Sequence, residues 1–228
     1  MKLDTNHVDV WRASLNALPD LHEVLSPDEL QRASRFHFEK DRRHFIAARG
    51  WMRVVLARYL DVTPASLCFE YGARGKPSLS ENRDLRFNLS HSHDLALLAV
   101  ARHREVGIDV EFMKESTAGP EIAERFFSAA EVAELCGFPF DRQRAAFFAG
   151  WTRKEAFIKA TGIGLFGALD RFTVSLAPDE SQVSLRVHDD EQESTRWTLF
   201  SLQPGEGYAG ALAAEGGDWQ LRCFDWPR

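Results

Sequence analysis

The sequence of 228 residues contains few cysteines and no long apolar run. Its three cysteines, Cys68, Cys136 and Cys223, are widely spaced and form no Cys-x-x-Cys pair or zinc motif, so we expect reduced thiols. No stretch approaches the roughly 18 consecutive apolar residues of a membrane helix. Residues 1–7 also lack the apolar segment that follows the basic region of a signal peptide. We therefore expect a cytoplasmic protein without a membrane partner.

The chain also lacks an excess of positive charge. Its formal net charge is -6, which disfavours a general nucleic-acid binder. The segment from Arg32 to Arg58 is nevertheless locally basic, with eight arginines and lysines against Glu39 and Asp41. Such a segment indicates either a discrete polyanionic ligand or a solvated helix face.

Local patterns predict the same order of elements in each half of the chain. In the first half a strand at 8–11 precedes a capping box at Ser26–Glu29, a helix over 41–59 and strands at 67–71, 85–89 and 95–101. In the second half a strand at 106–111 precedes a capping box at Ser128–Glu131, a helix over 142–161 and strands at 172–176, 183–187, 197–202, 208–213 and 219–224. No repeat of individual residues is evident, and no proline- or glycine-rich linker separates the halves. We predict an α+β fold with an N-terminal lobe over residues 1–103 and a C-terminal lobe over 104–228.

The segment Gly107–Glu111 places two carboxylates in a β-branched run. In a strand, Asp109 and Glu111 point to one side while Ile108 and Val110 point to the other. The pattern fits a pair of metal-binding carboxylates, and it equally fits the solvated edge of a strand.

The segment Trp151–Lys159 follows a helical pattern that places Glu155 and Lys159 one turn apart on the same face. A surface ion pair would explain these two residues without any function. Taken together with the strand, however, they supply three carboxylates and a lysine from rigid elements. This combination indicates a divalent-metal and acid–base site.

Three further motifs accompany these two segments. Gly75-Lys76-Pro77 precedes Phe87-Asn88-Leu89-Ser90-His91-Ser92, and Arg125-Phe126-Phe127-Ser128 lies between the strand and the helix. In this order the motifs resemble those of the 4'-phosphopantetheinyl transferases, specifically the long single-chain type that activates surfactin synthetase. The similarity runs from about Phe36 to Gly164.

The resemblance implies two similar lobes with pseudo-twofold symmetry, each a small, mainly antiparallel sheet packed with helices, and a ligand cleft between them. It implies an enzyme that transfers 4'-phosphopantetheine from coenzyme A to a serine of an apo acyl or peptidyl carrier protein. The products are the holo-carrier and 3',5'-ADP. Mg²⁺, or Mn²⁺ in its place, would serve as cofactor, and its preference for oxygen ligands agrees with the carboxylate set. Because both lobes lie in one chain, the cleft can form within a monomer.

The resemblance also implies roles for individual residues. Asp109, Glu111 and Glu155 would bind the metal, and Glu155, or a water it orients, would accept the serine proton. Lys159 would balance phosphate charge and assist the leaving group. Coenzyme A would contact Lys76, Pro77, Ser90, His91 and Lys159. Lys76 would contact the 3'-phosphate end of the nucleotide, and Arg49 would also reach the 3'-phosphate.

Some assignments stay open at this point. Arg43 or Arg53 could replace Arg49, and Arg32 could add a further contact. The segments Arg125–Ser128 and Phe138–Phe140 are candidates for carrier docking, although Phe126 and Phe127 could equally belong to the core. Two other functions are alternatives. A non-catalytic module that binds coenzyme A or another nucleotide is disfavoured by the three carboxylates, because binding a polyanion needs no acidic cluster. A metal-dependent phosphohydrolase would use the same carboxylates.

Overall fold

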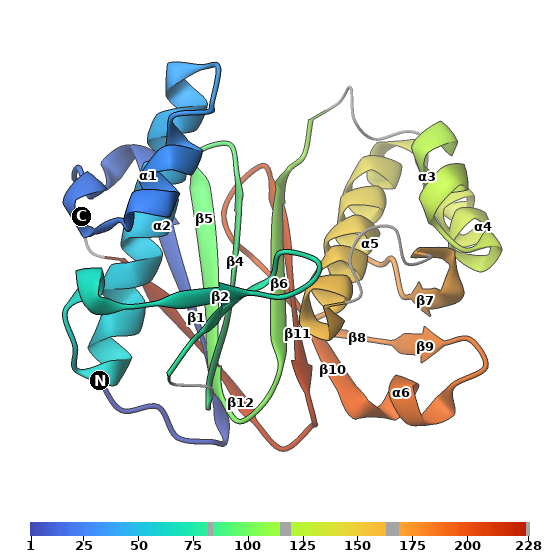
Figure 1. Cartoon of the computed structure of the whole chain (residues 1–228). Helices are drawn as coiled ribbons and strands as arrows, with labels where there is room; N and C mark the ends of the chain where they lie inside the picture. Colours follow the sequence, from blue (N-terminus) through green and yellow to red (C-terminus); the bar gives the residue numbers. More distant parts are fainter. Residues whose placement is uncertain (82–83, 115–119, 163–168, 227–228) are drawn as a thin grey trace.

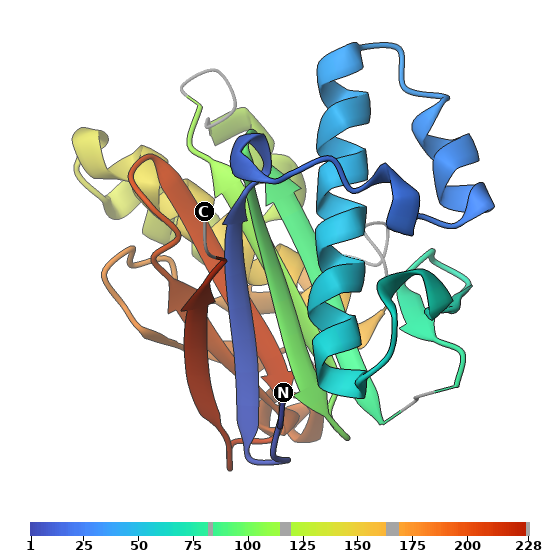
Figure 2. The same ribbon diagram turned by 90° about the vertical axis from the view of Figure 1, so that its left-hand side faces the viewer.

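In the computed structural model, two small sheets lie between two long helices (Figure 1). The structure describes residues 1–81, 84–114, 120–162 and 169–226. Turning the molecule by 90° shows the helix of residues Glu39–Leu60 standing beside the strands (Figure 2). Within the described parts of the chain, none of the helices combines the length and apolar character needed to cross a bilayer.

The first half begins with a strand and short helical turns and continues with helices and strands. Its main elements are β1 (His7–Ser14), α1 (Pro27–Ala33), α2 (Glu39–Leu60), β2 (Phe69–Tyr71), β3 (Pro77–Leu79), β4 (Leu85–Ser92) and β5 (Leu95–Arg102). The helix α1 starts as predicted at Ser26, whose backbone N–H donates to the Glu29 carboxylate at 3.0 Å. The short strand β3, which pairs with β2, was not predicted from the sequence.

The second half repeats this order. Its main elements are β6 (Val106–Phe112), α3 (Pro120–Phe126), α4 (Ala129–Gly137), α5 (Phe140–Thr161), β7 (Phe172–Val174), β8 (Gln182–Val183), β9 (Leu185–Val187), α6 (Glu191–Arg196), β10 (Trp197–Leu202), β11 (Tyr208–Glu215) and β12 (Gln220–Asp225). The predicted strand at 183–187 is instead two short strands, β8 and β9, which pair with β10 and β7 respectively. The helices α3 and α6 were not predicted.

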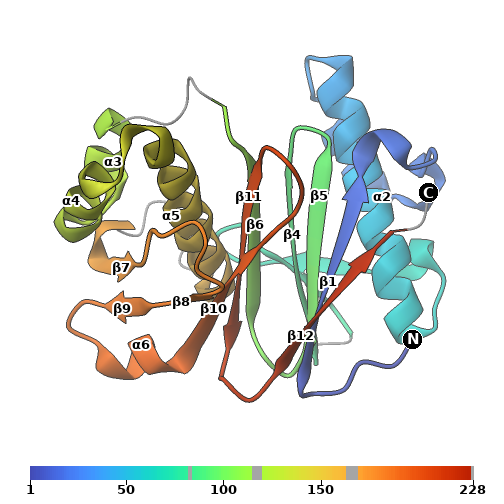
Figure 3. The ribbon, with the colours of Figure 1, turned by 180° about the vertical axis from the view of Figure 1, so that it is seen from behind.

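The two four-stranded sheets have related strand orders. One sheet has the order β12-β1-β5-β4 and the other β6-β11-β10-β8. In the first half the first strand, β1, pairs with β5, and in the second half the first strand, β6, pairs with β11. These antiparallel pairings and the flanking helices confirm the α+β class. The last strand, β12, pairs in parallel with β1 (Figure 3). Residues 220–225 thus lie in the sheet of the first half, and the division at 103/104 stays a prediction.

The structural correspondence exposes a short residue repeat that we did not expect from the sequence. Gly50-Trp51-Met52-Arg53 in α2 matches Gly150-Trp151-Thr152-Arg153 in α5. A Cβ at Gly50 would lie 2.4 Å from Leu21 Cβ, and one at Gly150 would lie 2.4 Å from Leu176 Cδ2. Both glycines therefore allow a neighbouring segment to approach the long helix closely.

The two arginines of this repeat also act alike. Arg53 donates to the carbonyl oxygens of Pro64 and Leu67, and Arg153 donates to those of Ser175 and Ala177. Each buried guanidinium thus ties its long helix to the chain that follows it. The two lobes share an internal design that extends to individual side chains.

The edge strands of the two sheets, β4 and β6, meet through side chains of β4. The side-chain amide oxygen of Asn88, Oδ1, accepts from the backbone N–H of Ile108 at 2.8 Å, and the Ser90 hydroxyl donates to Asp109 Oδ1 at 2.9 Å. Two residues on, the Ser92 hydroxyl donates to Glu111 Oε2 at 2.7 Å. Alternate residues of one strand face therefore bind the neighbouring strand.

On the opposite face of β6, Ile108 and Val110 are fully buried, as the alternation predicts. They join a cluster of apolar side chains that includes Val8 and Val10 of β1 and Leu212 of β11. This cluster draws on strands of both sheets, so the lobes share a core behind the polar face that carries Asp109.

Candidate active site at the junction of the lobes

The strand β6 presents Asp109 and Glu111 toward β4, as their spacing predicts. Asp109 is only 2% exposed, and its Oδ1 accepts from Lys159 Nζ at 2.6 Å and from the Ser90 hydroxyl at 2.9 Å. Glu111 is half-buried and is held by Ser92. These contacts fix both carboxylates by donors from neighbouring elements, which excludes a merely solvated strand edge.

A close approach between α5 and β6 brings the third carboxylate to this place. A Cβ at Gly107 would lie 2.1 Å from the carbonyl oxygen of Ala156 and 2.2 Å from the backbone nitrogen of Ala160. Only glycine leaves room for the helix backbone here. The site therefore requires a glycine at position 107. In the sequence, the position of this glycine within a β-branched run was the signal that the chain approaches a neighbour closely there.

Glu155 lies on α5 with 6% of its surface exposed, and its Oε1 has no hydrogen-bond partner among the described residues. Burial raises the pKa of Glu155 to about 7, and the charge of Asp109 and, less strongly, Glu111 adds to this effect while Lys159 opposes it. Burial likewise raises the pKa of Glu111. A carboxyl group that titrates near neutral pH is suited to accept and release a proton.

Lys159 bonds across the junction rather than along its own helix. Its ammonium contacts Asp109 Oδ1 at 2.6 Å and Ser90 Oγ at 3.1 Å, while no ion pair joins it to Glu155 in the described structure. The alternative of an exposed i,i+4 surface pair is therefore wrong. Lys159 thus places a positive charge among the side chains of Asp109, Glu111 and Glu155.

The carboxylate oxygens of Asp109, Glu111 and Glu155 are of the kind that a small divalent cation prefers. Among the described residues, however, no three His, Cys, Asp or Glu side chains are already arranged around a common metal position. Oδ1 of Asp109 and Oε2 of Glu111 have hydrogen-bond donors, whereas Asp109 Oδ2 and Glu155 Oε1 are buried without one. Buried anionic oxygens normally have a partner. Two free carboxylate oxygens suit Mg²⁺, which binds few carboxylates and completes its shell with water and phosphate.

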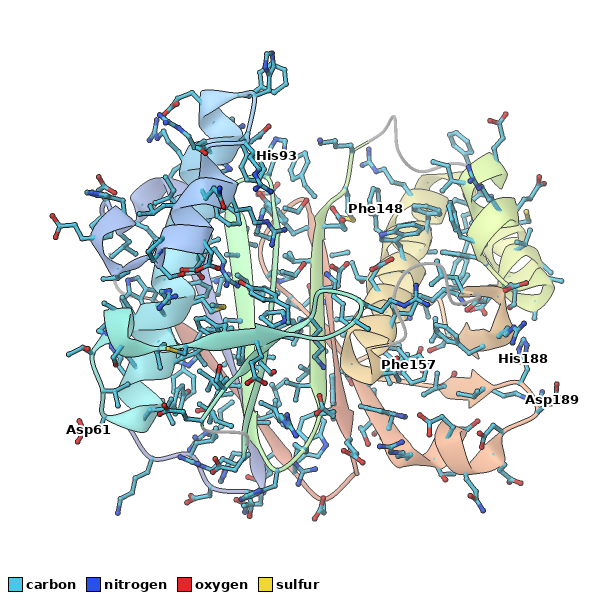
Figure 4. The ribbon with its side chains drawn as sticks, in the orientation of Figure 1. Asp61, His93, Phe148, Phe157, His188 and Asp189 are labelled. Carbon is cyan, nitrogen blue, oxygen red and sulfur yellow. The ribbon has the colours of Figure 1, made fainter. Side chains whose placement is uncertain are left out.

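The end of β4 and the turn after it contribute two imidazoles beside this site, His91 in the strand and His93 in the turn. Partial desolvation and the ammonium of Lys159 lower the pKa of His91, which favours its neutral form. His93, labelled in Figure 4, stacks on Phe112 with ring centroids 4.6 Å apart. His93 thus has a packing partner, and only His91 remains beside Ser90 for a ligand.

The Gly75–Pro77 motif forms the end of a hairpin that reaches toward α5 (Figure 1). Lys76 Nζ donates to Glu105, to the Val106 carbonyl oxygen and to the Ala160 carbonyl oxygen. Beside it lies a cavity of about 250 Å³ whose wall includes Lys76, Pro77, Arg74 and Arg86. The structure thus brings Lys76 to the C-terminal end of α5.

Two of the candidate arginines are bound inside the first lobe. Arg49 and Arg53 both contact the buried carboxylate of Glu29, at 2.6 Å each, and Arg49 also donates to the Tyr71 hydroxyl. Arg32 instead lines an open cavity of about 550 Å³ together with Tyr71. Contact between any of these arginines and coenzyme A remains a prediction.

The segments considered for carrier docking divide between core and surface. Phe127 is buried and stacks on Phe147, and Phe126 packs edge-on against Trp151. Phe140, at the start of α5, is 91% exposed. Of these aromatics, Phe140 is the side chain available to a partner.

The helix motif also contains a residue that serves the fold rather than the site. Lys154 is fully buried, and its ammonium pairs with Glu131 at 2.8 Å and donates to the carbonyl oxygens of Leu169 and Phe172. Figure 4 shows the neighbouring Phe157 on the same helix, where it belongs to the apolar core. Of two adjacent residues of α5, Lys154 therefore faces the core and Glu155 faces the candidate site.

Comparison with known proteins identifies the family to which this arrangement belongs. A family model described as "4'-phosphopantetheinyl transferase, N-terminal" matches residues 9–103. A second, described as "4'-phosphopantetheinyl transferase superfamily", matches residues 105–213. The chain belongs to the 4'-phosphopantetheinyl transferase family. The family inferred from the sequence motifs is confirmed.

Similar proteins support this assignment over most of the chain. The transferase is 38% identical to the 4'-phosphopantetheinyl transferase HetI of Nostoc sp., covering 98% of this chain and 94% of the relative. It is 32% identical to the 4'-phosphopantetheinyl transferase Sfp of Bacillus subtilis, covering 79% of each. The crystal structure of a holo-[acyl-carrier-protein] synthase from Thermotoga maritima matches with a TM-score of 0.38 and 25% identity, covering 49% of this chain and 62% of that one. On the evidence of the two family models and of these relatives in sequence, the chain is an enzyme that transfers phosphopantetheinyl groups to carrier proteins.

Proposed function

We propose that the transferase moves the 4'-phosphopantetheine group of coenzyme A to a serine of an apo acyl or peptidyl carrier protein, in a reaction that depends on Mg²⁺. The serine oxygen forms a bond to the β-phosphorus, and the bond from this phosphorus to the bridging oxygen breaks. The bridging oxygen leaves with 3',5'-ADP, and the serine proton passes to the enzyme. The products are the holo-carrier and 3',5'-ADP.

The observation that carries this proposal is the state of Glu155. Its Oε1 is buried without a hydrogen-bond partner, and its pKa is raised to about 7. In its charged form near neutral pH, Glu155 can take the serine proton directly or through a water. A well-placed base of this kind contributes a factor of about 10²–10⁴ in rate.

Lys159 and its partners would meet the charge of the pyrophosphate. Its ammonium is held by Asp109 and Ser90, so its position is fixed before substrate binds. Phosphoryl transfer gains most from such fixed charges, because negative charge spreads over the phosphate oxygens as the bond breaks. We assign Lys159 to the phosphates and the leaving group.

Asp109, Glu111 and Glu155 would hold the metal. Support comes from the oxygen donor set and from the unpartnered Asp109 Oδ2 and Glu155 Oε1. When bound, Mg²⁺, or Mn²⁺ in its place, supplies positive charge that neutralises the pyrophosphate. Of these carboxylates, Asp109 is oriented by Ser90 and Glu111 by Ser92.

Coenzyme A would lie along the junction, with its pyrophosphate near Ser90 and His91. A neutral His91 can donate one N–H to a phosphate oxygen. The nucleotide end would occupy the region of Lys76 and Pro77, and Arg49 or the more accessible Arg32 would lie toward the 3'-phosphate. The carrier would dock near Arg125–Ser128 and Phe138–Phe140, with the exposed Phe140 as its apolar contact.

We further propose that the enzyme works as a monomer in the cytoplasm. The catalytic carboxylates and Lys159 all come from one chain, and the three cysteines are free. The enzyme's proposed partners are coenzyme A and carrier proteins, and we propose no nucleic-acid or membrane partner.

Intact-protein mass spectrometry tests the reaction. Apo-carriers from fatty-acid, polyketide and peptide-synthetase systems are incubated with enzyme, coenzyme A and Mg²⁺, with EDTA as control. A metal-dependent gain of one phosphopantetheine arm is expected. Release of 3',5'-ADP without any carrier would indicate a phosphohydrolase instead.

A further inference from the structure

The contacts of Lys76 use every hydrogen that its ammonium can donate. Nζ lies 2.9 Å from Glu105 Oε2, 3.1 Å from the Val106 carbonyl oxygen and 3.0 Å from the Ala160 carbonyl oxygen. A lysine ammonium has three N–H donors and no acceptor. Three acceptors at hydrogen-bond distance leave no donor for a phosphate.

These acceptors all belong to the other half of the chain. Lys76 stands on the hairpin of β2 and β3, whereas Val106 begins β6 and Ala160 is in the last turn of α5. The carbonyl groups of a last helical turn lack partners within the helix and carry partial negative charge. A lysine from the first half thus caps the catalytic helix of the second.

Glu105 keeps the lysine in this position. Its other oxygen, Oε1, lies 3.2 Å from Arg86 Nε of β4. The carboxylate is therefore bound from two sides, by Lys76 and by Arg86, and both cations come from the first half. Only 22% of the Lys76 side chain is exposed, which shields these contacts from water.

We infer that Lys76 is a positioning residue that locks the β2–β3 hairpin to the end of α5 and the start of β6, rather than a ligand of the coenzyme A 3'-phosphate. The helix end that it holds is close in sequence to Lys159 and about one and a half turns beyond Glu155. Locking this end fixes the depth and rotation of both catalytic side chains against Asp109. The kinetic consequence rests on the proposed function, whereas the structural one does not.

Arg74 provides a matched control. It is an exposed cation two residues before Lys76, lines the same cavity and has no ion pair among the described contacts. Arg74→Ala removes a positive charge from the hairpin without touching the lock. Glu105→Gln leaves Lys76 intact but removes the charge that holds it.

The test compares coenzyme A with 3'-dephospho-coenzyme A for wild type, Lys76→Met, Glu105→Gln and Arg74→Ala. We expect Lys76→Met to lower kcat by a factor of about 10–100 to the same extent with both substrates, as a displaced catalytic group would. Glu105→Gln should lower kcat in the same substrate-independent manner, whereas Arg74→Ala, in the wall of the proposed nucleotide site, should change the KM for coenzyme A rather than kcat. A Lys76→Met defect that appears as a raised KM for coenzyme A and vanishes with the dephospho substrate would overturn the inference.

Hydrogen exchange of the substrate-free proteins tests the lock without any activity. Lys76→Met should speed amide exchange in the hairpin around residues 72–77 and in the last turn of α5, while exchange in α2 stays as in wild type. Unchanged exchange at both places would also overturn the inference. If wild type transfers nothing to any carrier, the proposed function fails while this measurement still decides the role of Lys76.

Discussion

Lys159 Nζ lies 2.6 Å from Asp109 Oδ1, on a neighbouring strand, although Glu155 stands one turn away on its own helix. The pairing leaves Glu155 Oε1 without a partner and places it among negative neighbours. One lysine thus stabilises the charge of Asp109 while the pKa of Glu155 remains high. The same helix supplies both a fixed cation and a group that titrates near neutral pH.

Replacing Glu155 should change stability in a pH-dependent way. An ordinary glutamate titrates near 4.5, whereas burial raises the pKa of Glu155 to about 7. Between pH 4.5 and pH 7 the folded protein binds more protons at this group than the unfolded chain does, so the free energy of unfolding falls as pH rises. Above pH 7 the charged Glu155 carboxylate lowers the free energy of unfolding by about 3 kcal/mol. Glu155→Gln should therefore stabilise the metal-free protein little near pH 5 and most near pH 8.

Urea denaturation in EDTA buffer at several pH values measures this difference. A gap between variant and wild type that does not change from pH 5 to pH 8 would contradict the assigned pKa. The same variant should lose transfer activity by a factor of about 10²–10⁴, because an amide cannot accept the serine proton.

Removal of Asp109 should separate transfer from binding. Asp109→Ala deletes the oxygens that face Lys159 and would bind the proposed metal, so transfer should fall below detection in the mass-spectrometric assay. Coenzyme A should still bind in metal-free buffer, since its other contacts remain. Normal transfer by Asp109→Ala would refute the metal assignment, and calorimetric titration with coenzyme A shows whether the binding site survives.

Ser92 should affect the metal requirement rather than the substrate. Its hydroxyl donates to Glu111 Oε2 at 2.7 Å and accepts from the backbone N–H of Phe112 at 3.1 Å. Loss of a group that orients a metal ligand typically costs a factor of about 10–100 in metal affinity or activity. Ser92→Ala should raise the half-activating Mg²⁺ concentration about tenfold while KM for coenzyme A stays near the wild-type value.

A direct titration of Mn²⁺ by electron paramagnetic resonance gives the same comparison without turnover. Ser66→Ala is the matched control, because the Ser66 hydroxyl bonds only to the nearby Thr63 carbonyl oxygen on the surface. Equal Mn²⁺ affinity in Ser92→Ala and wild type would show that Glu111 needs no support from β4.

The buried pair of Lys154 and Glu131 should show strong non-additivity in stability. Lys154→Met alone leaves the buried Glu131 carboxylate without its cation and should cost about 3–5 kcal/mol. Adding Glu131→Gln removes that unpaired charge and should recover part of the loss. Double-mutant cycles from urea denaturation measure the coupling, and two losses that simply add would indicate that the pair contributes nothing as a unit.

Much of this architecture could be predicted from local sequence signals. The capping boxes at Ser26 and Ser128 mark real helix starts, and the alternation around Asp109 correctly separates its polar face from Ile108 and Val110. These features succeed because they depend on residues close in the chain. Asp109 and Glu111 could be placed on one strand face for the same reason, whereas grouping them with Glu155 depended on the resemblance to the transferase family.

What the sequence did not indicate depends on partners far away in the chain. Lys154 and Glu155 are adjacent, and only the fold shows that Lys154 meets Glu131 in the core while Glu155 faces Asp109. The partners of Arg49 are equally distant, so its burial against Glu29 left no local pattern. The Gly-Trp-x-Arg repeat is visible in the sequence. A match of four residues becomes significant only once the structure shows that α2 and α5 occupy equivalent places and that the repeated residues make equivalent contacts.

The parallel pairing of β12 with β1 sets an order for assembly. His7 lies opposite Gln220, so the sheet of the first lobe is completed by a segment made after almost all of the second lobe. During synthesis on the ribosome, β1 therefore keeps one unsatisfied edge until residues 220–225 have emerged, and a pairing of such sequence separation forms slowly. A fragment that ends near residue 103 would carry this open edge permanently and would be prone to associate with other chains. The two lobes are similar in design, yet the first cannot mature before the second.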